Sequence, residues 1–139
     1  MSFQNQFTKT TTDANLMETV HHGSAEYPFR YYYENIALFD FKCIDWHWHS
    51  ELEFIYIESG NVVFDIGTVH FELNEGNGIM INSKILHRLQ SSSDAIIPNF
   101  LFQPSFIAPQ DSLIYKKYIN PVISSSLEYL VFQPDIPWQ

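Results

Sequence analysis

Two histidines, a glutamate and a more distant histidine carry the residue types needed to bind a metal ion or a polar ligand. They are His47, His49, Glu53 and His87. Side chains two positions apart on a strand share a face and lie roughly 6.6 Å apart, so imidazoles 47 and 49 can converge. Each imidazole nitrogen would bind an ion at about 2.0–2.1 Å. Three imidazoles and one carboxylate suit Zn, Ni, Mn or Fe(II), with coordination positions left for water or a substrate.

The same four side chains have a second interpretation that involves no ion. Partly buried histidine and glutamate side chains commonly hydrogen-bond to one another and rigidify a polar pocket. A divalent metal site and a metal-free polar pocket therefore both remain open. Among the other histidines, His70 is expected on an outward face, and His21 and His22, in a polar N-terminal segment, are assigned no ligand role.

The composition is typical of one globular domain. The chain has 139 residues, of which 45% are hydrophobic and 17% aromatic, too apolar for a disordered segment. Its net charge of −9 would repel a phosphate backbone, so the chain itself is not expected to contact nucleic acid. Cys43 is the single cysteine, which excludes an internal disulfide. No secretory signal or membrane-spanning run is visible, so we expect a cytoplasmic protein.

Nine short segments rich in Val, Ile, Phe and Tyr are predicted to be strands separated by Gly, Asn and Ser turns. They are residues 29–35, 36–43, 46–49, 53–58, 61–66, 69–73, 78–82, 86–91 and 95–103. Short strands at regular spacing predict an antiparallel, all-β sandwich or barrel. We therefore expect a barrel over 27–104, preceded by a polar arm at 1–26 that is flexible unless something ties it down.

The pattern after Gln103 changes from alternating to helical. Asp111 or Ser112 is expected to cap a helix over 113–119 that Pro121 ends, and a second short helix is expected at 126–130. Residues 105–139 thus form a predicted helical tail. Because the chain stops soon after these helices begin, we expect it to be one module of a longer polypeptide.

Aromatic residues and an arginine complete the candidate set. Trp46, Trp48 and Phe54 should face away from the histidines, and we expect them to pack between sheets or at a subunit contact rather than on a ligand ring. Arg30 would offer a fork-shaped cation to a carboxylate or hydroxylated ligand. A surface salt bridge is the alternative role for this arginine.

Two segments resemble the two conserved motifs of the cupin superfamily. They read His47-x-His49-x3-Glu53-x6-Gly60 and Gly76-x5-Asn82-x-Lys84-x2-His87. Asn82 and Lys84 stand where the second motif usually has Pro and Gly, so that motif is degraded. The resemblance implies the cupin (RmlC-like) fold, a double-stranded β-helix or jelly-roll barrel. It also implies that the four residues named first are the metal ligands.

Longer stretches resemble the amino-terminal sensor domain of AraC-type bacterial transcription regulators. They are His22-Gly23, Tyr27-Pro28-Phe29, His47-Trp48-His49, Glu53-Phe54-Ile55-Tyr56-Ile57, Phe102-Gln103-Pro104-Ser105-Phe106 and Tyr115-Lys116-Lys117-Tyr118-Ile119-Asn120-Pro121. The resemblance implies an effector-sensing and dimerisation domain. A small, for example sugar-like, molecule would bind inside the barrel to the three histidines, Glu53 and Arg30. DNA would be bound only by a helix-turn-helix domain beyond Gln139, in a homodimer with no membrane partner.

A protein of another class is the alternative. A stand-alone metal-dependent cupin enzyme, such as a dioxygenase or a sugar isomerase, would use the same four residues as metal ligands. A third interpretation is a ligand-binding barrel without any DNA partner. The degraded second motif and the position of the chain end favour the sensor, to which we assign no catalytic residue.

Overall fold

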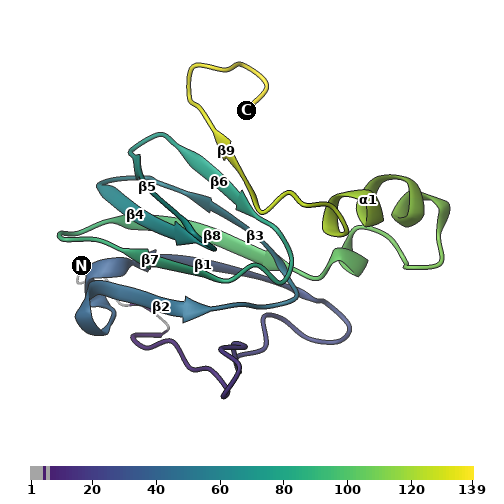
Figure 1. Cartoon of the computed structure of the whole chain (residues 1–139), viewed down its shortest axis with the longest axis horizontal. Helices are drawn as coiled ribbons and strands as arrows, with labels where there is room; N and C mark the ends of the chain where they lie inside the picture. The colour runs from purple at the N-terminus through teal and green to yellow at the C-terminus, as the bar shows by residue number, and fades with distance from the viewer. Residues whose placement is uncertain (1–4, 6) are drawn as a thin grey trace.

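The computed structural model describes residues 5 and 7–139, and within them the strands form two antiparallel sheets (Figure 1). The five-stranded sheet has the order β1 (Phe29–Asn35), β8 (Ile96–Phe102), β3 (Leu52–Tyr56), β6 (Gly78–Ile81), β9 (Tyr129–Phe132). The four-stranded sheet has the order β2 (Cys43–His47), β7 (His87–Gln90), β4 (Asn61–Ile66), β5 (Val69–Asn74). Strands distant in sequence are neighbours in both sheets, which is the predicted jelly-roll arrangement.

The apolar core lies between the two sheets and is built from the inward face of each strand. In β4, for example, Val62, Phe64 and Ile66 are fully buried. The core cluster comprises Ile36, Ile55, Ile57, Val62, Phe64, Ile66, Leu73, Ile79, Ile81, Leu89, Ala95 and Ile97. Removing these side chains from water is the main force that closes the barrel. The rest of the interior carries polar side chains, so the apolar cluster serves as the frame that positions them.

The strand predicted at 36–43 is wrong. The chain there forms two 3₁₀ turns, η1 (Ile36–Leu38) and η2 (Asp40–Lys42). The Asn35 side chain accepts a 3.0 Å hydrogen bond from the backbone N–H of Ala37, which caps the first turn in place of a strand ladder. Phe41 and Lys42 then adopt positive φ angles of 59° and 52°, which no strand tolerates.

The tail also departs from prediction. Ser112 caps its helix by accepting a 3.1 Å hydrogen bond from the Tyr115 N–H, as expected. The helix does not end at Pro121 but continues from a π-helical turn, η4 (Tyr115–Ile119), into α1 (Asn120–Ile123), after the 3₁₀ turn η3 (Pro104–Phe106). The wider π turn leaves room for the proline ring, which would clash with a carbonyl of a regular α-helix.

The second helix predicted at 126–130 is not formed either. Residues Tyr129–Phe132 are strand β9, which pairs with β6 and places Tyr129 and Val131 against the core. This short, continuously apolar run is interpreted as helical from the sequence alone, but as a strand it packs one face against the barrel. The edge of β6 is thereby covered.

The described part of the polar arm, residues 5 and 7–26, lies along the barrel beside the end of β2. Its backbone pairs with Trp48: the Trp48 N–H donates to the Leu16 carbonyl (3.0 Å), and the Glu18 N–H donates to the Trp48 carbonyl (2.9 Å). The indole Nε1–H of Trp48 donates to the carbonyl of Asn15 (2.9 Å). These three bonds tie the arm to the residue that lies between His47 and His49.

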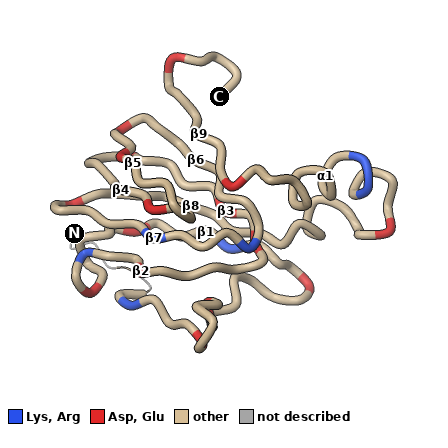
Figure 2. Tube along the Cα trace, viewed as in Figure 1, with Lys and Arg blue, Asp and Glu red and all other residues tan. Residues whose placement is uncertain are grey.

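Asp and Glu residues are spread along the described trace (Figure 2). Asp and Glu total 16 against seven Lys and Arg, and the basic residues are scattered along the trace rather than gathered on one strand. Across the residues that the structure describes, helices are too short or too polar to cross a membrane.

Candidate functional site

The structure brings together the four residues that the sequence singled out. His47, His49, Glu53 and His87 each offer a ligand atom, and these atoms all lie within 4.8 Å of one another. All four side chains are buried, with His87 completely inaccessible. A set of three imidazoles and a carboxylate therefore converges inside the barrel.

Different elements supply these four residues. His47 ends β2 and His87 begins β7, where they are register partners with ring centroids 4.2 Å apart. Glu53 comes from β3 of the opposite sheet, and His49 from the link between β2 and β3. The cluster thus bridges the two sheets, and its geometry depends on the packing of the whole barrel.

Backbone carbonyls orient all three histidine rings. Each Nδ1–H donates to a nearby carbonyl oxygen: His47 to Asp45 (2.7 Å), His87 to Ile85 (2.7 Å) and His49 to Glu51 (3.1 Å). A carbonyl only accepts, so in each case Nδ1 carries the proton and Nε2 is turned to the interior. This is the outer-sphere arrangement that fixes the tautomer of metal-binding histidines.

The Glu53 carboxylate is the electrostatic centre of the cluster. Its Oε2 lies 3.0 Å from His49 Nε2 and 3.1 Å from His87 Nε2. Burial alone would raise the pKa of Glu53, but these two hydrogen bonds hold it well below its usual value. Burial likewise disfavours charge on His49, yet the Glu53 hydrogen bond and charge raise its pKa to about 8. The cluster without metal therefore holds a buried imidazolium–carboxylate pair.

The third imidazole of the interior is neutral. Burial, reinforced by the neighbouring His87, lowers the pKa of His47 to about 3. A neutral Nε2 has a lone pair available for coordination. Two ligand atoms about 2.1 Å from one ion and at right angles lie about 3 Å apart, which matches the Glu53 contacts to His49 and His87. The donor set thus fits a divalent transition metal once His49 gives up its extra proton.

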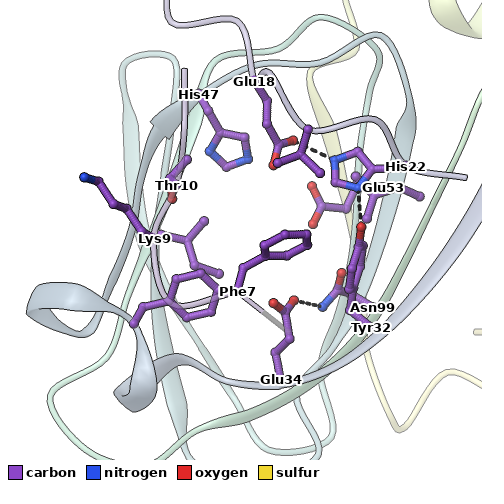
Figure 3. Close-up of a pocket in the computed structure, with 14 residues that line it drawn as sticks. Phe7, Lys9, Thr10, Glu18, His22, Tyr32, Glu34, His47, Glu53 and Asn99 are labelled. Atoms are coloured by element: carbon purple, nitrogen blue, oxygen red, sulfur yellow. Dashed lines mark hydrogen bonds and ion pairs between the residues drawn. The ribbon is translucent and has the colours of Figure 1, made fainter. Parts of the chain in front are cut away.

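A cavity of about 50 Å³ opens beside this cluster (Figure 3). His47 and Glu53 face it. The arm contributes six of its fourteen lining residues; the full set is Phe7, Lys9, Thr10, Glu18, Val20, His22, Tyr32, Glu34, Phe39, Ile44, His47, Glu53, Asn99 and Leu101. Barrel and arm therefore form one enclosure together.

His22, which the sequence analysis left without a role, is part of that wall. It is buried, and its ring lies 5.9 Å from that of His49. Its Nε2 donates to the Glu18 carboxylate (2.7 Å), while its Nδ1 pairs with the Tyr32 hydroxyl (2.7 Å). Burial raises the pKa of Tyr32 to about 12, so that hydroxyl stays protonated. No local pattern in the polar arm distinguishes His22 from the exposed His21.

The remaining candidates lie outside the cavity. Arg30 is exposed on β1, with its guanidinium carbon 5.7 Å from the Tyr32 ring centroid, and it lines a neighbouring groove with the arm. His70 is exposed, as predicted, and contacts Asp65. Trp46 lies under the Arg88 guanidinium (5.1 Å), and Phe54 stacks on Phe100 (5.1 Å) on the outer face of the five-stranded sheet.

Sequence comparison decides the family. Residues 38–108 match the model of the AraC-like ligand binding domain, which covers half of the chain. The chain belongs to the AraC-like ligand-binding domains. This sensing domain is also 32% identical over 129 residues to the uncharacterized HTH-type transcriptional regulator YdeC of Bacillus subtilis (strain 168). That alignment covers 91% of the chain but 44% of the relative, so the AraC-like domain spans less than half of that protein.

Solved structures agree with the barrel of this AraC-like domain. A predicted oxalate decarboxylase from Thermotoga maritima has a TM-score of 0.50 at 20% identity, covering 62% of this chain and 79% of that one. A cupin 2 conserved barrel domain protein from Salinispora arenicola also has a TM-score of 0.50, at 13% identity, covering 64% and 71%. At these identities the likeness establishes the cupin fold alone, which confirms the predicted fold class.

Proposed function

We propose that the cavity binds a small-molecule effector and that the position of the arm reports its presence. The observation that carries this proposal is the shared wall: six arm residues line the same small enclosure as His47 and Glu53 of the buried cluster. A ligand there contacts both bodies at once. The arm can lie against the barrel or be displaced from it. A ligand shifts the arm between these positions only if it binds the protein with different affinity in each, which is the requirement for any sensor.

The four converging residues supply the second part of the proposal. His47, His49, Glu53 and His87 would hold a divalent metal, with Zn, Ni, Mn and Fe(II) all compatible with the ligand types. The bound ion would act as a Lewis acid that attracts an oxygen or nitrogen atom of the effector. The residues of this chain contribute the orientation, through the three Nδ1–carbonyl bonds, and the exclusion of bulk water, through burial.

The rest of the regulator follows from the family. We propose a homodimer in the cytoplasm whose DNA contacts lie in a separate helix-turn-helix domain; the similarity to YdeC, an HTH-type transcriptional regulator, supports the DNA-binding part of this proposal. Along the described trace in Figure 2 the few Lys and Arg positions do not form a continuous basic stripe that would suit a phosphate backbone. We assign the domain no catalysis. A metal-dependent cupin enzyme would use the same ligands. The arm residues that line the cavity favour a sensor, because a ligand bound there would contact the arm.

Zinc is the probe that tests the proposed coupling. The tag-free, chelator-treated chain is titrated with Zn²⁺ by calorimetry, and arm cleavage by a dilute protease is followed with and without saturating zinc. Glu18 lies in the arm and lines the cavity together with His47 and Glu53. The added positive charge should attract Glu18, so arm cleavage should slow at least threefold.

His49→Ala should weaken zinc binding at least a hundredfold and abolish the protection, since one of four ligands is removed. His70→Ala is the matched control, because that exposed histidine lies outside the cavity. Tight zinc binding that leaves arm cleavage unchanged would contradict the sensing proposal and favour a metal site of another purpose. Absence of zinc binding would contradict the metal site.

A further inference from the structure

A second carboxyl group is buried in the same cavity, away from the histidines. Glu34 lies near the end of β1, is 7% exposed, and lines the cavity. Its Oε1 accepts a 3.0 Å hydrogen bond from the side-chain amide of Asn99 on β8. In Figure 3, Glu34 lies at the lower side of the cavity, and His47 and Glu18 lie at the upper side. The enclosure thus has two polar ends.

The Glu34 carboxylate has no oppositely charged side chain in contact with it within the described part of the chain. No ion pair of the described residues involves it. Lys9 lines the cavity but is exposed, and Figure 3 shows its ammonium directed away. Burial, with added repulsion from Glu53 and Glu18, raises the pKa of Glu34 to about 7 despite the Asn99 hydrogen bond. A cation placed beside Glu34 would relieve this cost.

The surroundings of Glu34 present acceptors and aromatic faces. Both amide protons of Asn99 have acceptors, namely Glu34 Oε1 and the Ile97 carbonyl (2.9 Å), which leaves its side-chain carbonyl oxygen to accept from a ligand. The rings of Phe7, Tyr32 and Phe39 line the same cavity. A carboxylate, an amide oxygen and aromatic faces are the groups that bind an ammonium ion.

We propose that Glu34 and Asn99 bind the ammonium group of a small organic cation, which makes protonated amines the effector class. This inference rests on the proposed function, because it places the effector in the cavity. Anions are disfavoured, since Glu18, Glu34 and Glu53 all line the enclosure. At 10–15 Å³ for each water-sized group, a cavity of this size holds roughly four non-hydrogen atoms. A larger amine would insert its charged end and displace part of the arm.

Three probes of similar size and different charge test the assignment: ethanolamine, ethylene glycol and glycolate at pH 7.5. Each is titrated into the chelator-treated chain, and amide signals, including the Asn99 side chain, are followed by NMR. Ethanolamine should bind at least tenfold more tightly than either of the other probes. Glu34→Gln keeps the volume and the Asn99 hydrogen bond but removes the charge, so it should weaken ethanolamine binding at least tenfold. Glu72→Gln, the same change at an exposed position, should have no effect.

Equal binding of ethylene glycol, tighter binding of glycolate, or no loss in Glu34→Gln would each overturn the assignment. Should Glu34→Gln fail to fold, the three-probe comparison on the unaltered chain decides the question alone. Zinc binding and arm protection distinguish the two proposals. If both occur without any preference for the amine, the amine assignment fails and the sensing proposal stands.

Discussion

Two buried glutamates of one cavity behave in opposite ways. Glu53 and Glu34 are exposed to nearly the same extent, 8% and 7%. The pKa of Glu53 is held well below its usual value, whereas that of Glu34 is raised to about 7. Glu53 Oε2 lies 3.0 Å and 3.1 Å from the Nε2 atoms of His49 and His87, of which the protonated His49 donates a charged hydrogen bond, while Glu34 accepts one from a neutral amide. The charge of the hydrogen-bond partner, and not the extent of burial, therefore accounts for the difference between the two pKa values.

This difference in pKa indicates that the two ends of the cavity have different roles. The Glu53 end is electrostatically complete, since its carboxylate already has an imidazolium partner in His49. The Glu34 end is incomplete, because burying a carboxylate without a cation costs free energy. At the Glu53 end a metal would replace the proton that His49 directs at Glu53. At the Glu34 end a cationic ligand would supply the missing positive charge. The comparison therefore assigns separate roles to two chemically identical side chains.

Removing Glu53 should give the largest effect. Glu53→Ala breaks a buried ion pair by removing the hydrogen-bond and charge partner of His49, so the free energy of unfolding of the metal-free chain should fall by about 3–5 kcal/mol at pH 7. Urea denaturation measures the change. Glu72→Ala serves as the control, because that side chain is exposed on β5. A loss no greater than in the control would show that the Glu53 pair contributes little to stability.

Removing the charge at Glu34 should raise the free energy of unfolding, in contrast to removing Glu53. A carboxyl with a folded pKa of about 7 and an unfolded value of 4.5 loses its proton on unfolding between these pH values. The free energy of unfolding therefore falls as pH rises from 4.5 to 7. Glu34→Gln lacks this penalty and should be more stable than the parent by about 1–3 kcal/mol at pH 8.

Urea denaturation at pH 4.5, 6 and 8 follows that difference. The two proteins should differ little at pH 4.5, where Glu34 is protonated in nearly all folded molecules and in about half of the unfolded ones. Glu72→Gln should track the parent at every pH. A difference between Glu34→Gln and the parent that stays constant with pH would mean that Glu34 does not titrate as its surroundings indicate.

The same comparison explains what sequence reasoning found at the site. The Glu53 end was predictable because His47, His49 and Glu53 are near neighbours with strand parity and ligand chemistry. Glu34 was not, since its hydrogen-bond partner Asn99 lies 65 positions away. His22 was missed for the same reason: it lines the cavity only because the arm folds back onto residues that are distant in sequence. Arg30 was included on charge alone, and the structure places it in the neighbouring groove.

In the fold, too, elements set by local sequence patterns were predictable, whereas elements set by contacts distant in sequence were not. The strand 61–66 was predicted to the residue because alternating apolar side chains follow clear turn signals. Segment 36–43 was mistaken for a strand because a single side-chain cap, from Asn35, redirects its β-prone residues. The strand at Tyr129–Phe132 exists because the edge of β6 accepts it, which no local pattern reveals.

The arm covers both ends of the cavity, and its attachment gives the smallest of the expected effects. Trp48→Phe removes the indole hydrogen bond to Asn15 but keeps the two backbone bonds to Leu16 and Glu18. One such bond contributes about 0.5–1.5 kcal/mol. Opening of the arm should therefore become roughly twofold to tenfold more frequent. Hydrogen exchange of the Glu18 amide, which donates to the Trp48 carbonyl, measures it.

Trp46→Phe is the matched control, because that indole packs against Arg88 rather than the arm. Equal acceleration in both variants would mean that general loosening of β2, not the indole bond, releases the arm. Faster exchange in Trp48→Phe alone would show that the indole bond holds the arm closed at Glu18. When Glu18 and Phe7 leave the cavity with the opened arm, water would reach both carboxylates. The pKa difference between Glu53 and Glu34 should narrow accordingly, since water replaces the burial that raises the pKa of Glu34.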